Sequence, residues 1–420
     1  MIKDPNIYLT RYAYPKFYLD YEPDATTELI VVLPCHNESE LLISLAAIDD
    51  CDSQYPVEII VVINAAEDAP EEVKQQNINT YNAVIEWQRG KKELNKNFHF
   101  ILENDLPKKH AGVGLARKIG MDEAVRMFEA IDKPNGVILC FDADCTCEQN
   151  LLTEVSNFFK ENPSSPGCSI NFEHPLEGEL PEQVYKAITF YEMHLRYYVD
   201  ALKYAVFPYA FQTIGSSMAV RSAAYQKQGG MNRRKAGEDF YFLHKIIPLG
   251  DFGEVNTTTI YPSPRASDRV PFGTGRAVGE WLSGDQREYL TYNHQIFEDL
   301  KNFLAQVDSY FRINHKDIQK QVGHLSESIR EFLTISDFDQ KIAEVKSQST
   351  NIDTFRKRFY QWFDGFRVLK YVHFARDHYY PNISTSEAVK WLFQKYNLEA
   401  YHEPKEMLLE LRRADKSKIW

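Results

Sequence analysis

Gly136-Val-Ile-Leu-Cys-Phe-Asp-Ala-Asp144 is an apolar run that ends abruptly in two carboxylates. The run from Val137 to Phe141 has no polar alternation, which is typical of a central strand covered on both faces of a parallel sheet. If the extended geometry continues, Asp142 and Asp144 point to the same side beyond the strand, because residues two apart share a face. In open α/β sheets, ligands bind at this carboxyl end.

Two interpretations of the Asp-Ala-Asp tripeptide stay open at this point. Mg²⁺ is usually held by one or two carboxylates together with substrate phosphates, so the pair suits a metal–diphosphate site. The same tripeptide also suits a solvated turn with a helix cap, and taken alone it favours that simpler structure. The rest of the chain has to decide between them.

The composition is that of a globular protein. The 420 residues are 44% hydrophobic and 26% charged, which leaves room for one large or two medium domains. A net charge of -12 without a basic block argues against a nucleic-acid partner. We expect no signal peptide and no membrane span, with peripheral membrane contact left open. The six cysteines match neither a disulfide framework nor zinc spacing, so we expect reduced thiols in a cytoplasmic protein.

Strands and helices alternate through the first part of the chain. Four apolar runs are each followed by a helical pattern, which predicts an α/β, Rossmann-like, mostly parallel sheet with helices on both faces. The Tyr- and Pro-rich residues 1–28 are expected to form an extended arm. The strands are expected at 29–33, 57–63, 98–102 and 136–141, with a helix at 181–206, a strand at 255–260 and a long loop at 261–279.

The pattern changes after about residue 280. Apolar residues at helical spacing predict one helix over 289–311 and another over 355–369. Ser384-Thr-Ser-Glu387 resembles a capping box that opens a third. We therefore expect a first domain at 1–280 and a helical domain at 281–420, whose aromatic stripes serve core or inter-domain packing.

Polar groups follow several of the predicted strands. They converge on one edge if the sheet is parallel, as an enzyme acting on a nucleoside diphosphate requires. The groups are Asn37 with Glu38, Asn64 with Asp68, Asp142 with Asp144, and Glu238 with Asp239 at a later helix start.

Taken in order, these motifs resemble the family 2 glycosyltransferases with the GT-A fold, over roughly residues 28–280. The resemblance rests on six segments: Val31-Val-Leu-Pro-Cys-His-Asn-Glu38, Ile60-Val-Val-Ile-Asn-Ala-Ala-Glu-Asp68, Gly112-Val-Gly-Leu-Ala-Arg-Lys-Ile-Gly120, Asp142-Ala-Asp144, Gly215-Ser-Ser-Met-Ala-Val-Arg221 and Glu238-Asp239.

The resemblance, together with the negative charge that a departing nucleoside diphosphate gains, suggests a role for individual residues. Asp239 is expected to be the general base, with Glu238 as the alternate base or its orienting partner. Asp144 is expected to bind Mn²⁺ or Mg²⁺, and Asp142 to bind the metal, its water or the ribose. For each basic residue alone, a surface salt bridge is the competing interpretation. The nucleotide-sugar residues would be Pro34, His36, Asn37, Glu38, Asn64, Asp68, Gly114, Arg117, Lys118, Asp142, Ala143, Asp144, Arg265 and Arg269, with Arg276 and His110 as further candidates and Gly215, Ser216 and Ser217 on the acceptor side.

We therefore expect a metal-dependent transferase that moves a sugar from a nucleotide-diphosphate donor to an acceptor hydroxyl with inversion, in polysaccharide or glycoconjugate synthesis. The second predicted strand ends in Asn64-Ala-Ala where such enzymes usually have an Asp pair, which leaves the base open. A non-catalytic sugar-nucleotide scaffold remains an alternative. A sugar nucleotidyltransferase is a second alternative, but it should carry a Gly-rich basic loop directly after the first strand. This chain has Pro34-Cys-His-Asn-Glu38 there, which counts against that alternative. Gly112 and Gly114 match the first two glycines of the dinucleotide-binding fingerprint, but Arg117 stands where the third glycine is required. The sequence therefore argues against a dinucleotide-binding site.

Overall fold

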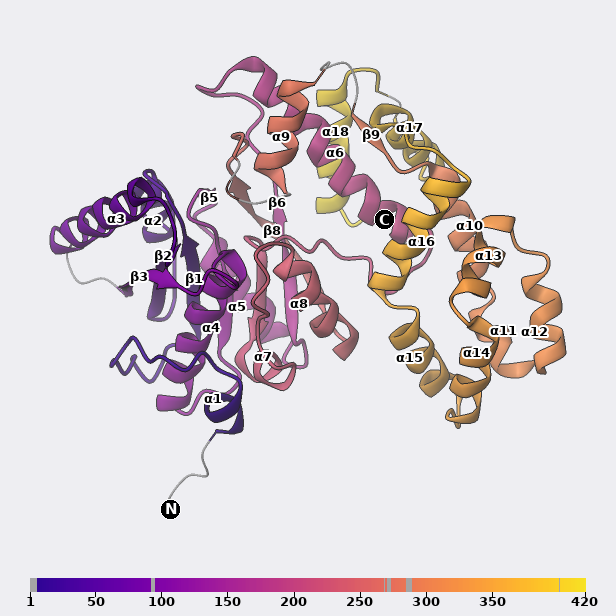
Figure 1. Ribbon diagram of the computed structural model, residues 1–420, viewed down its shortest axis with the longest axis horizontal. Helices are drawn as coiled ribbons and strands as arrows, with labels where there is room; N and C mark the ends of the chain where they lie inside the picture. Colours follow the sequence, from indigo (N-terminus) through magenta and orange to yellow (C-terminus); the bar gives the residue numbers. More distant parts are fainter. Residues whose placement is uncertain (1–5, 92–94, 268, 270–272, 285–288, 400) are drawn as a thin grey trace. The chain divides into compact units, whose positions relative to one another are not determined.

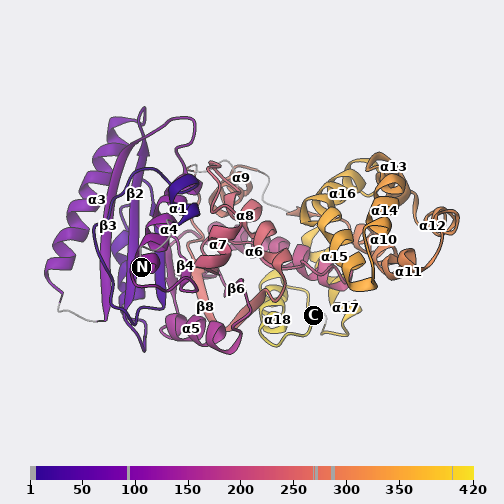
Figure 2. The ribbon, with the colours of Figure 1, turned by 90° about the horizontal axis from the view of Figure 1, so that it is seen from below.

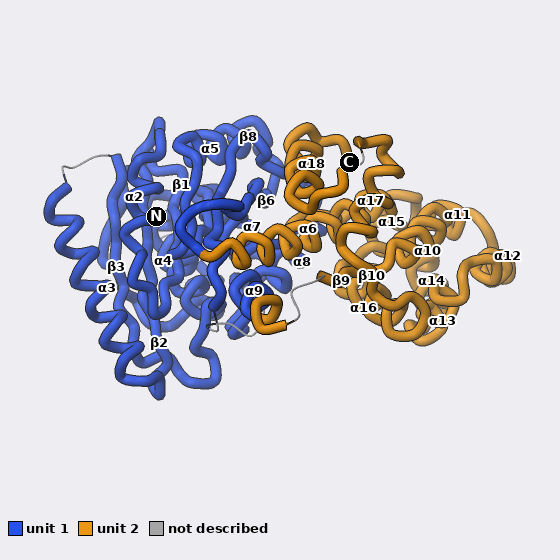
Figure 3. Tube along the Cα trace, turned by 90° about the horizontal axis from the view of Figure 1, so that it is seen from above, with its two compact units in different colours: residues 1–180, 213–279 blue, residues 181–212, 280–420 orange. Residues whose placement is uncertain are grey.

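The computed structural model describes residues 6–91, 95–267, 269, 273–284, 289–399 and 401–420 (Figure 1). The chain forms two compact units, drawn in two colours in Figure 3. Unit 1 contains residues 1–180 and 213–279, and unit 2 contains residues 181–212 and 280–420. The sequence-based boundary at 280 assigns residues 181–212 to the first domain, whereas in the structure they are part of the helical unit.

Within the described residues, unit 1 is built on an eight-stranded sheet with the order β3-β2-β1-β4-β7-β6-β8-β5. β1 pairs in parallel with β2 and β4, and β2 pairs in parallel with β3. β6 is also parallel to β8. β7 is antiparallel to both of its neighbours, and β5 is antiparallel to β8. The predicted α/β class with a mostly parallel sheet is thus confirmed. The strands are β1 (Leu29–Cys35), β2 (Val57–Ala66), β3 (Lys96–Leu106), β4 (Val137–Cys140), β5 (Cys145–Cys147), β6 (Gly167–Phe172), β7 (Met218–Arg221) and β8 (Gly253–Pro262).

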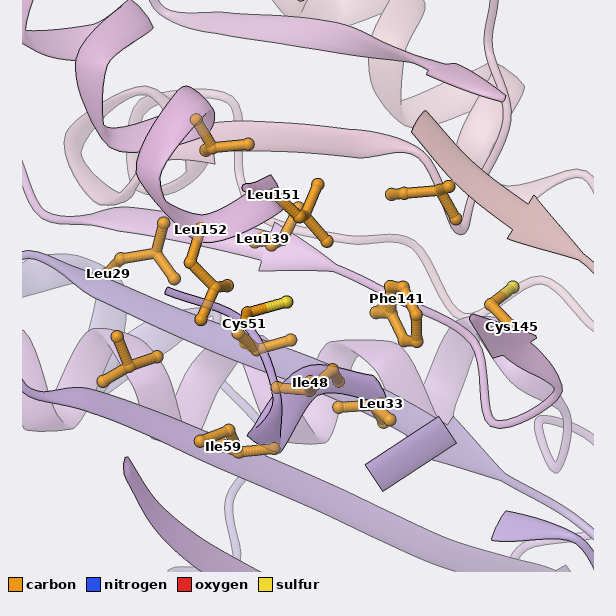
Figure 4. Packing of buried hydrophobic residues seen from close by; sticks show 14 of the residues in the cluster. Leu29, Leu33, Ile48, Cys51, Ile59, Leu139, Phe141, Cys145, Leu151 and Leu152 are labelled. Atoms are coloured by element: carbon orange, nitrogen blue, oxygen red, sulfur yellow. The ribbon is translucent and has the colours of Figure 1, made fainter. Parts of the chain in front are cut away.

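Helices cover both faces of this sheet, and alternate strand residues decide which helix each face meets. Val31 and Leu33 share a buried cluster with residues of α2, α3 and α5, part of which is shown in Figure 4. On the other face, a Cβ at Gly120 of α4 would lie 2.5 Å from Val32 Cγ1, so glycine lets α4 approach the sheet closely. The helices of unit 1 are α1 (Ile7–Arg11), α2 (Leu41–Asp49), α3 (Glu71–Arg89), α4 (Val113–Ala130), α5 (Leu151–Glu161), α7 (Ser222–Lys227) and α8 (Glu238–Ile246), the last followed by the 3-10 turn η1 (Ile247–Leu249), and Figure 2 gives a second view of them.

The N-terminal arm begins with the short helix α1 and then runs extended along unit 1, while residues 1–5 of the predicted arm lie outside the described residues. Tyr8 is 5% exposed, and its hydroxyl donates to Asp122 Oδ1 at 2.6 Å. Lys118 Nζ lies 2.9 Å from the same hydroxyl. The backbone N–H of Tyr14 donates to Asp122 Oδ2 at 2.6 Å. The arm is therefore held on α4 by buried polar contacts.

The helices of unit 2 differ in part from the sequence-based expectation. The predicted helix over 289–311 is divided into β9 (Leu290–Thr291), α10 (His294–Leu304) and α11 (Val307–Arg312). Asn293 starts α10 by accepting a hydrogen bond from the backbone N–H of Gln295. The predicted helix over 355–369 is interrupted because the Asp364 side chain caps a new helix, accepting from the N–H of Arg367. The predicted cap at Ser384 is confirmed, since its hydroxyl accepts from the N–H of Glu387 at 3.1 Å.

The predicted aromatic stripes form the core of unit 2. Phe303, Phe355 and Phe359 are fully buried, and the Phe303 and Phe363 rings lie 5.1 Å apart. None of the described helices is long and apolar enough to span a bilayer. The remaining elements are α6 (Glu182–Tyr204), α9 (Thr274–Ser283, which runs across the boundary between the units), α12 (His315–Val322), α13 (Glu327–Ile335), α14 (Phe338–Ser347), α15 (Ile352–Trp362), α16 (Gly365–His378), β10 (Ile383–Ser384), α17 (Thr385–Lys395) and α18 (Pro404–Lys416).

Candidate active site

Two neighbouring parallel strands, β1 and β4, end in acidic residues at one edge of the sheet. After β1 comes Glu38, which is only 1% exposed. Arg265 Nη1 lies 3.3 Å from Glu38 Oε1, and Arg269 Nη1 lies 2.9 Å from Glu38 Oε2. Burial raises the pKa of Glu38, but the hydrogen bonds from Arg265, the Glu40 backbone and Arg269 outweigh it and hold the pKa below its usual value.

The Asp142-Ala143-Asp144 turn follows β4. Its central carbonyl, Ala143 O, accepts a hydrogen bond from Ser44 Oγ of α2 at 2.9 Å, which fixes the turn. The two carboxylates keep 33% and 32% of their side-chain surface exposed. Arg265 Nη2 lies 3.4 Å from Asp144 Oδ2, and Arg269 Nη2 lies 3.8 Å from it. Burial, and then the charge of Asp142, raise the pKa of Asp144. The two carboxylates therefore repel each other.

Arg117 of α4 connects this turn to the Glu-Asp motif. Its guanidinium is 1% exposed, donates to Asp142 Oδ1 at 2.6 Å and also donates to Glu238 Oε1 of α8. Burial disfavours the charged guanidinium, yet Asp142 and Glu238 raise the pKa of Arg117 above its ordinary value. Burial also raises the pKa of Glu238, against the effect of Arg117. Arg117 is thus the buried counter-ion of two predicted site acids.

Asp239, the second residue of α8, lies beside the Gly215 backbone. The N–H of Phe240 donates to Asp239 Oδ1 at 2.7 Å. A Cβ at Gly215 would lie 2.8 Å from Arg117 Nη1 and 3.0 Å from Asp239 Oδ2, so only a glycine leaves both groups undisturbed. Burial raises the pKa of Asp239, and Arg117 and the Phe240 N–H oppose that rise. Asp239 is only partly buried, whereas Glu238 is 3% exposed.

The candidate base-binding residues at the ends of β1 and β2 form one hydrogen-bonded group. His36 Nδ1 lies 2.7 Å from Asn64 O, and Asn64 Nδ2 donates to Cys35 O at 2.8 Å. Asn77 of α3 accepts from the N–H of Asn37 at 3.0 Å and donates to Asn64 O at 2.9 Å. The Asn64 amide nitrogen is therefore used within the protein.

The remaining predicted site residues make other contacts. Asp68 forms an exposed ion pair of 2.6 Å with Lys108, and Lys118 is 3% exposed beneath the N-terminal arm. A Cβ at Gly114 would lie 2.3 Å from Arg234 O, so this glycine serves close packing. Pro34 is buried in β1, and Ser216 and Ser217 are buried with their hydroxyl oxygens 3.5 Å apart. Arg276 is exposed on α9, and His110 lies in the loop before α4. Residues 268 and 270–272 of the predicted loop fall outside the described residues.

Two residues that organise the site were not predicted from the sequence. Ser44 fixes the turn between the paired aspartates, and Asn77 joins the loops after β1 and β2. Each is a buried polar residue within a helix. A polar residue on the apolar stripe of a helix was the available signal, because buried polar side chains need partners.

The side chains that could bind the predicted metal ion are the carboxylates of Asp142 and Asp144. Among the residues that the structure describes, no group of three or more His, Cys, Asp or Glu side chains is arranged to hold a metal ion by itself. Mg²⁺, however, usually takes only one or two carboxylates and completes its coordination with water and phosphate. Two partly exposed, mutually repelling carboxylates at Asp142 and Asp144 fit such a shared cation.

Comparisons with known proteins leave the family undetermined. No protein-family model matches the chain, and no curated protein matches it. Among solved structures, residues 1–349 of TarS from S. aureus in complex with UDP-GlcNAc give a TM-score of 0.39 at 13% identity, covering 80% of this chain and 91% of that chain. The same fragment with UDP gives 0.38 at 13% identity, covering 80% and 92%. At these values the likeness carries no argument about function, so our proposal rests on the site itself.

Proposed function

We propose that the protein is a glycosyltransferase that takes a sugar from a nucleoside-diphosphate donor and passes it to an acceptor hydroxyl with the help of Mg²⁺ or Mn²⁺. The observation that carries the proposal is the convergence of Asp142 and Glu238 on the buried Arg117, with Asp239 and Gly215 at its side. This arrangement joins the predicted diphosphate end of the site to the predicted base. Of these acids, Asp142 and Asp239 remain partly open to solvent.

Asp142 and Asp144 are the residues that would hold the cation. A divalent cation bound there stabilises the negative charge that the departing diphosphate gains as the glycosidic bond breaks. Arg265 and Arg269 lie on the same carboxylate edge, and their guanidinium groups suit bidentate contacts with phosphate oxygens. In the structure they neutralise Glu38 and Asp144.

Asp239 is our proposed general base. It is the more accessible acid of the pair, and the Phe240 N–H orients its carboxylate. Glu238 is engaged by Arg117 and cannot turn toward an acceptor without giving up this buried ion pair. A single carboxylate on the acceptor side favours direct displacement and therefore inversion at the anomeric carbon. Gly215, Ser216 and Ser217 would border the acceptor.

Calorimetric titration of UDP and GDP, each with and without Mn²⁺, tests the donor site. We expect one nucleotide to bind with metal and its affinity to fall about tenfold or more in Asp144→Asn. The matched control is Asp353→Asn, at an exposed aspartate of α15. If neither nucleotide binds the folded wild-type protein, the nucleotide-donor proposal is wrong.

Release of nucleoside diphosphate from UDP- and GDP-linked sugars tests the chemistry. We expect kcat to fall about 10²- to 10⁴-fold in Asp239→Asn, with the donor affinity retained. Unchanged turnover in this variant would remove Asp239 from the base role. Nucleotide binding without any release by the wild type would favour the non-catalytic scaffold.

A further inference from the structure

A pair of cysteines lies outside the proposed site, on two elements that are far apart in the sequence. Cys51 follows the C-terminal end of α2, and Cys147 ends β5. The distance between Cys51 Sγ and Cys147 Sγ is 3.6 Å. In the structure all six cysteines are free thiols.

The two thiols share a fixed environment. The Cys51 thiol donates to Ala47 O at 3.3 Å, and Cys147 Sγ lies 3.9 Å from the same carbonyl oxygen. β5 is held against β8, with Cys147 opposite Ile260. Figure 4 shows Cys51 between Ile48 and Leu152 in the buried cluster. Because both elements are fixed by packing, the sulfur atoms stay within reach of each other.

We propose that Cys51 and Cys147 are an oxidisable dithiol site that closes to an intramolecular disulfide with a thiol oxidant of the disulfide class, such as oxidised glutathione. An S–S bond measures about 2.05 Å, so closing it requires a movement of about 1.5 Å, within the range of side-chain rotation. The proposal is independent of the transferase function.

The two thiols differ in solvent exposure and in pKa. Cys147 is partly exposed, whereas Cys51 is only 3% exposed. The hydrogen bond from Cys147 lowers the pKa of Cys51 despite burial, and Lys96 adds to the effect. The same hydrogen bond, and then burial, raise the pKa of Cys147. Burial raises the pKa of Cys140 to about 12 and also raises that of Cys168. Cys51 is therefore distinguished from the inert core thiols.

The reaction balances in two exchanges. Cys147 Sγ attacks oxidised glutathione while its proton passes to the Cys51 thiolate, which leaves a mixed disulfide on Cys147 and releases one glutathione thiolate. Cys51 then loses that proton to solvent, and its thiolate attacks the Cys147 sulfur and releases the second glutathione. In total, one disulfide is broken and one is formed, the protein loses two protons and two electrons, and the oxidant becomes two glutathione thiols.

The test is peptide mapping of the full chain after native treatment with oxidised glutathione, blocking of the remaining thiols and digestion without reductant. Cys140, Cys145 and Cys147 lie together between Lys133 and Lys160 with no lysine or arginine between them, so a tryptic mass alone cannot separate them. Cys35 and Cys51 likewise share one tryptic peptide, residues 17–74. Variants therefore make the assignment. We expect a cross-link between the two peptides in the wild type and in Cys145→Ser, and none in Cys147→Ser or Cys51→Ser.

Fragmentation spectra of the wild-type cross-link give a second assignment that does not depend on any variant folding. Fragments that place the bond between Cys51 and Cys147 support the proposal. A cross-link that survives in Cys147→Ser or Cys51→Ser, or one that maps to Cys35, Cys140 or Cys145, overturns it. So does a wild-type protein that ends with only a stable glutathione adduct on Cys147, or with both thiols unmodified.

Discussion

Arg117 is a fully buried cation whose charge is matched by Asp142 and Glu238. Its Nε has no hydrogen-bond partner in the structure, so the guanidinium is held through its two terminal nitrogens. The sequence suggested a diphosphate ligand at this position. The structure instead places the guanidinium between two protein acids, so its measurable effect should appear first in stability.

We expect Arg117→Met to lower the free energy of unfolding by about 3–5 kcal/mol, because two acids lose their buried counter-ion. Urea unfolding at pH 7 measures the change. Arg89→Met, at an exposed arginine of α3, is the matched control and should stay within about 0.5 kcal/mol of wild type. Equal effects of the two substitutions would contradict the counter-ion role.

His194 of α6 provides a pH-dependent contribution to stability. Its Nδ1 lies 2.7 Å from Thr291 Oγ1, and burial lowers its pKa to about 4. An unfolded histidine titrates near 6.5, so between these values the unfolded state binds the extra proton. The contribution is fully present above about pH 6.5 and is lost as the pH falls toward 4.

Unfolding free energies measured from pH 7 to pH 4 should therefore fall less steeply in His194→Gln than in the wild type. The difference should reach up to about 3 kcal/mol. His315→Gln, at an exposed histidine of α12, should keep the wild-type slope. A wild-type slope in His194→Gln would show that this histidine is not buried in its neutral form.

At the scale of elements, α4 carries the site on one side and the N-terminal arm on another. Successive helix residues point about 100° apart, so neighbouring Arg117 and Lys118 face different surroundings. Arg117 meets Asp142, whereas Lys118 lies 3.0 Å from Asp122 and close to the Tyr8 hydroxyl. The arm thus packs against the helix that carries the central arginine.

We expect Tyr8→Phe to destabilise the protein by about 1–3 kcal/mol, because Asp122 and Lys118 each lose a buried hydrogen bond. Tyr12→Phe removes a hydroxyl from a residue that is 56% exposed and should change stability by less than about 0.5 kcal/mol. Chemical denaturation of both variants tests the difference. If Tyr8→Phe matched Tyr12→Phe, the buried contacts would not be what holds the arm.

At the scale of the whole chain, unit 1 is interrupted in sequence by α6, which belongs to unit 2. Tyr197 of α6 packs edge-on against Phe297, with ring centroids 5.6 Å apart. Glu192 of α6 accepts from Arg412 Nη2 at 2.6 Å. A break at residue 280 therefore separates α6 from partners that bury its apolar and charged side chains.

A fragment of residues 1–280 should consequently expose the side chains of Tyr197 and Glu192 on α6. We expect it to bind a hydrophobic dye strongly and to aggregate, while the full chain does neither. Co-expression with residues 281–420 should restore a soluble complex. A soluble, monomeric fragment that binds no dye would mean that α6 needs no partner from the C-terminal helices.

Elements that depend on a continuous local sequence pattern were the ones predicted correctly. The apolar runs of β1, β2 and β4 located the parallel strands, because buried strands need continuous apolar sequence. The cap at Ser384 was found for a similar reason, since its hydrogen bond spans three residues. The cap at Asp364 also spans three residues, but the split there was missed because the aromatic period continues across it.

The sequence by itself determined the α/β class, the carboxyl-edge position of Asp142 and Asp144, and the helix capped by Ser384, because these depend on local pattern and on the geometry of parallel strands. Only the tertiary structure decided which groups meet. It buried Lys118 beneath the arm, paired Asp68 with Lys108 and set Arg117 between Asp142 and Glu238. It also brought Cys51 to Cys147. Such pairings depend on the packing of segments far apart in the chain, which the local sequence pattern does not specify.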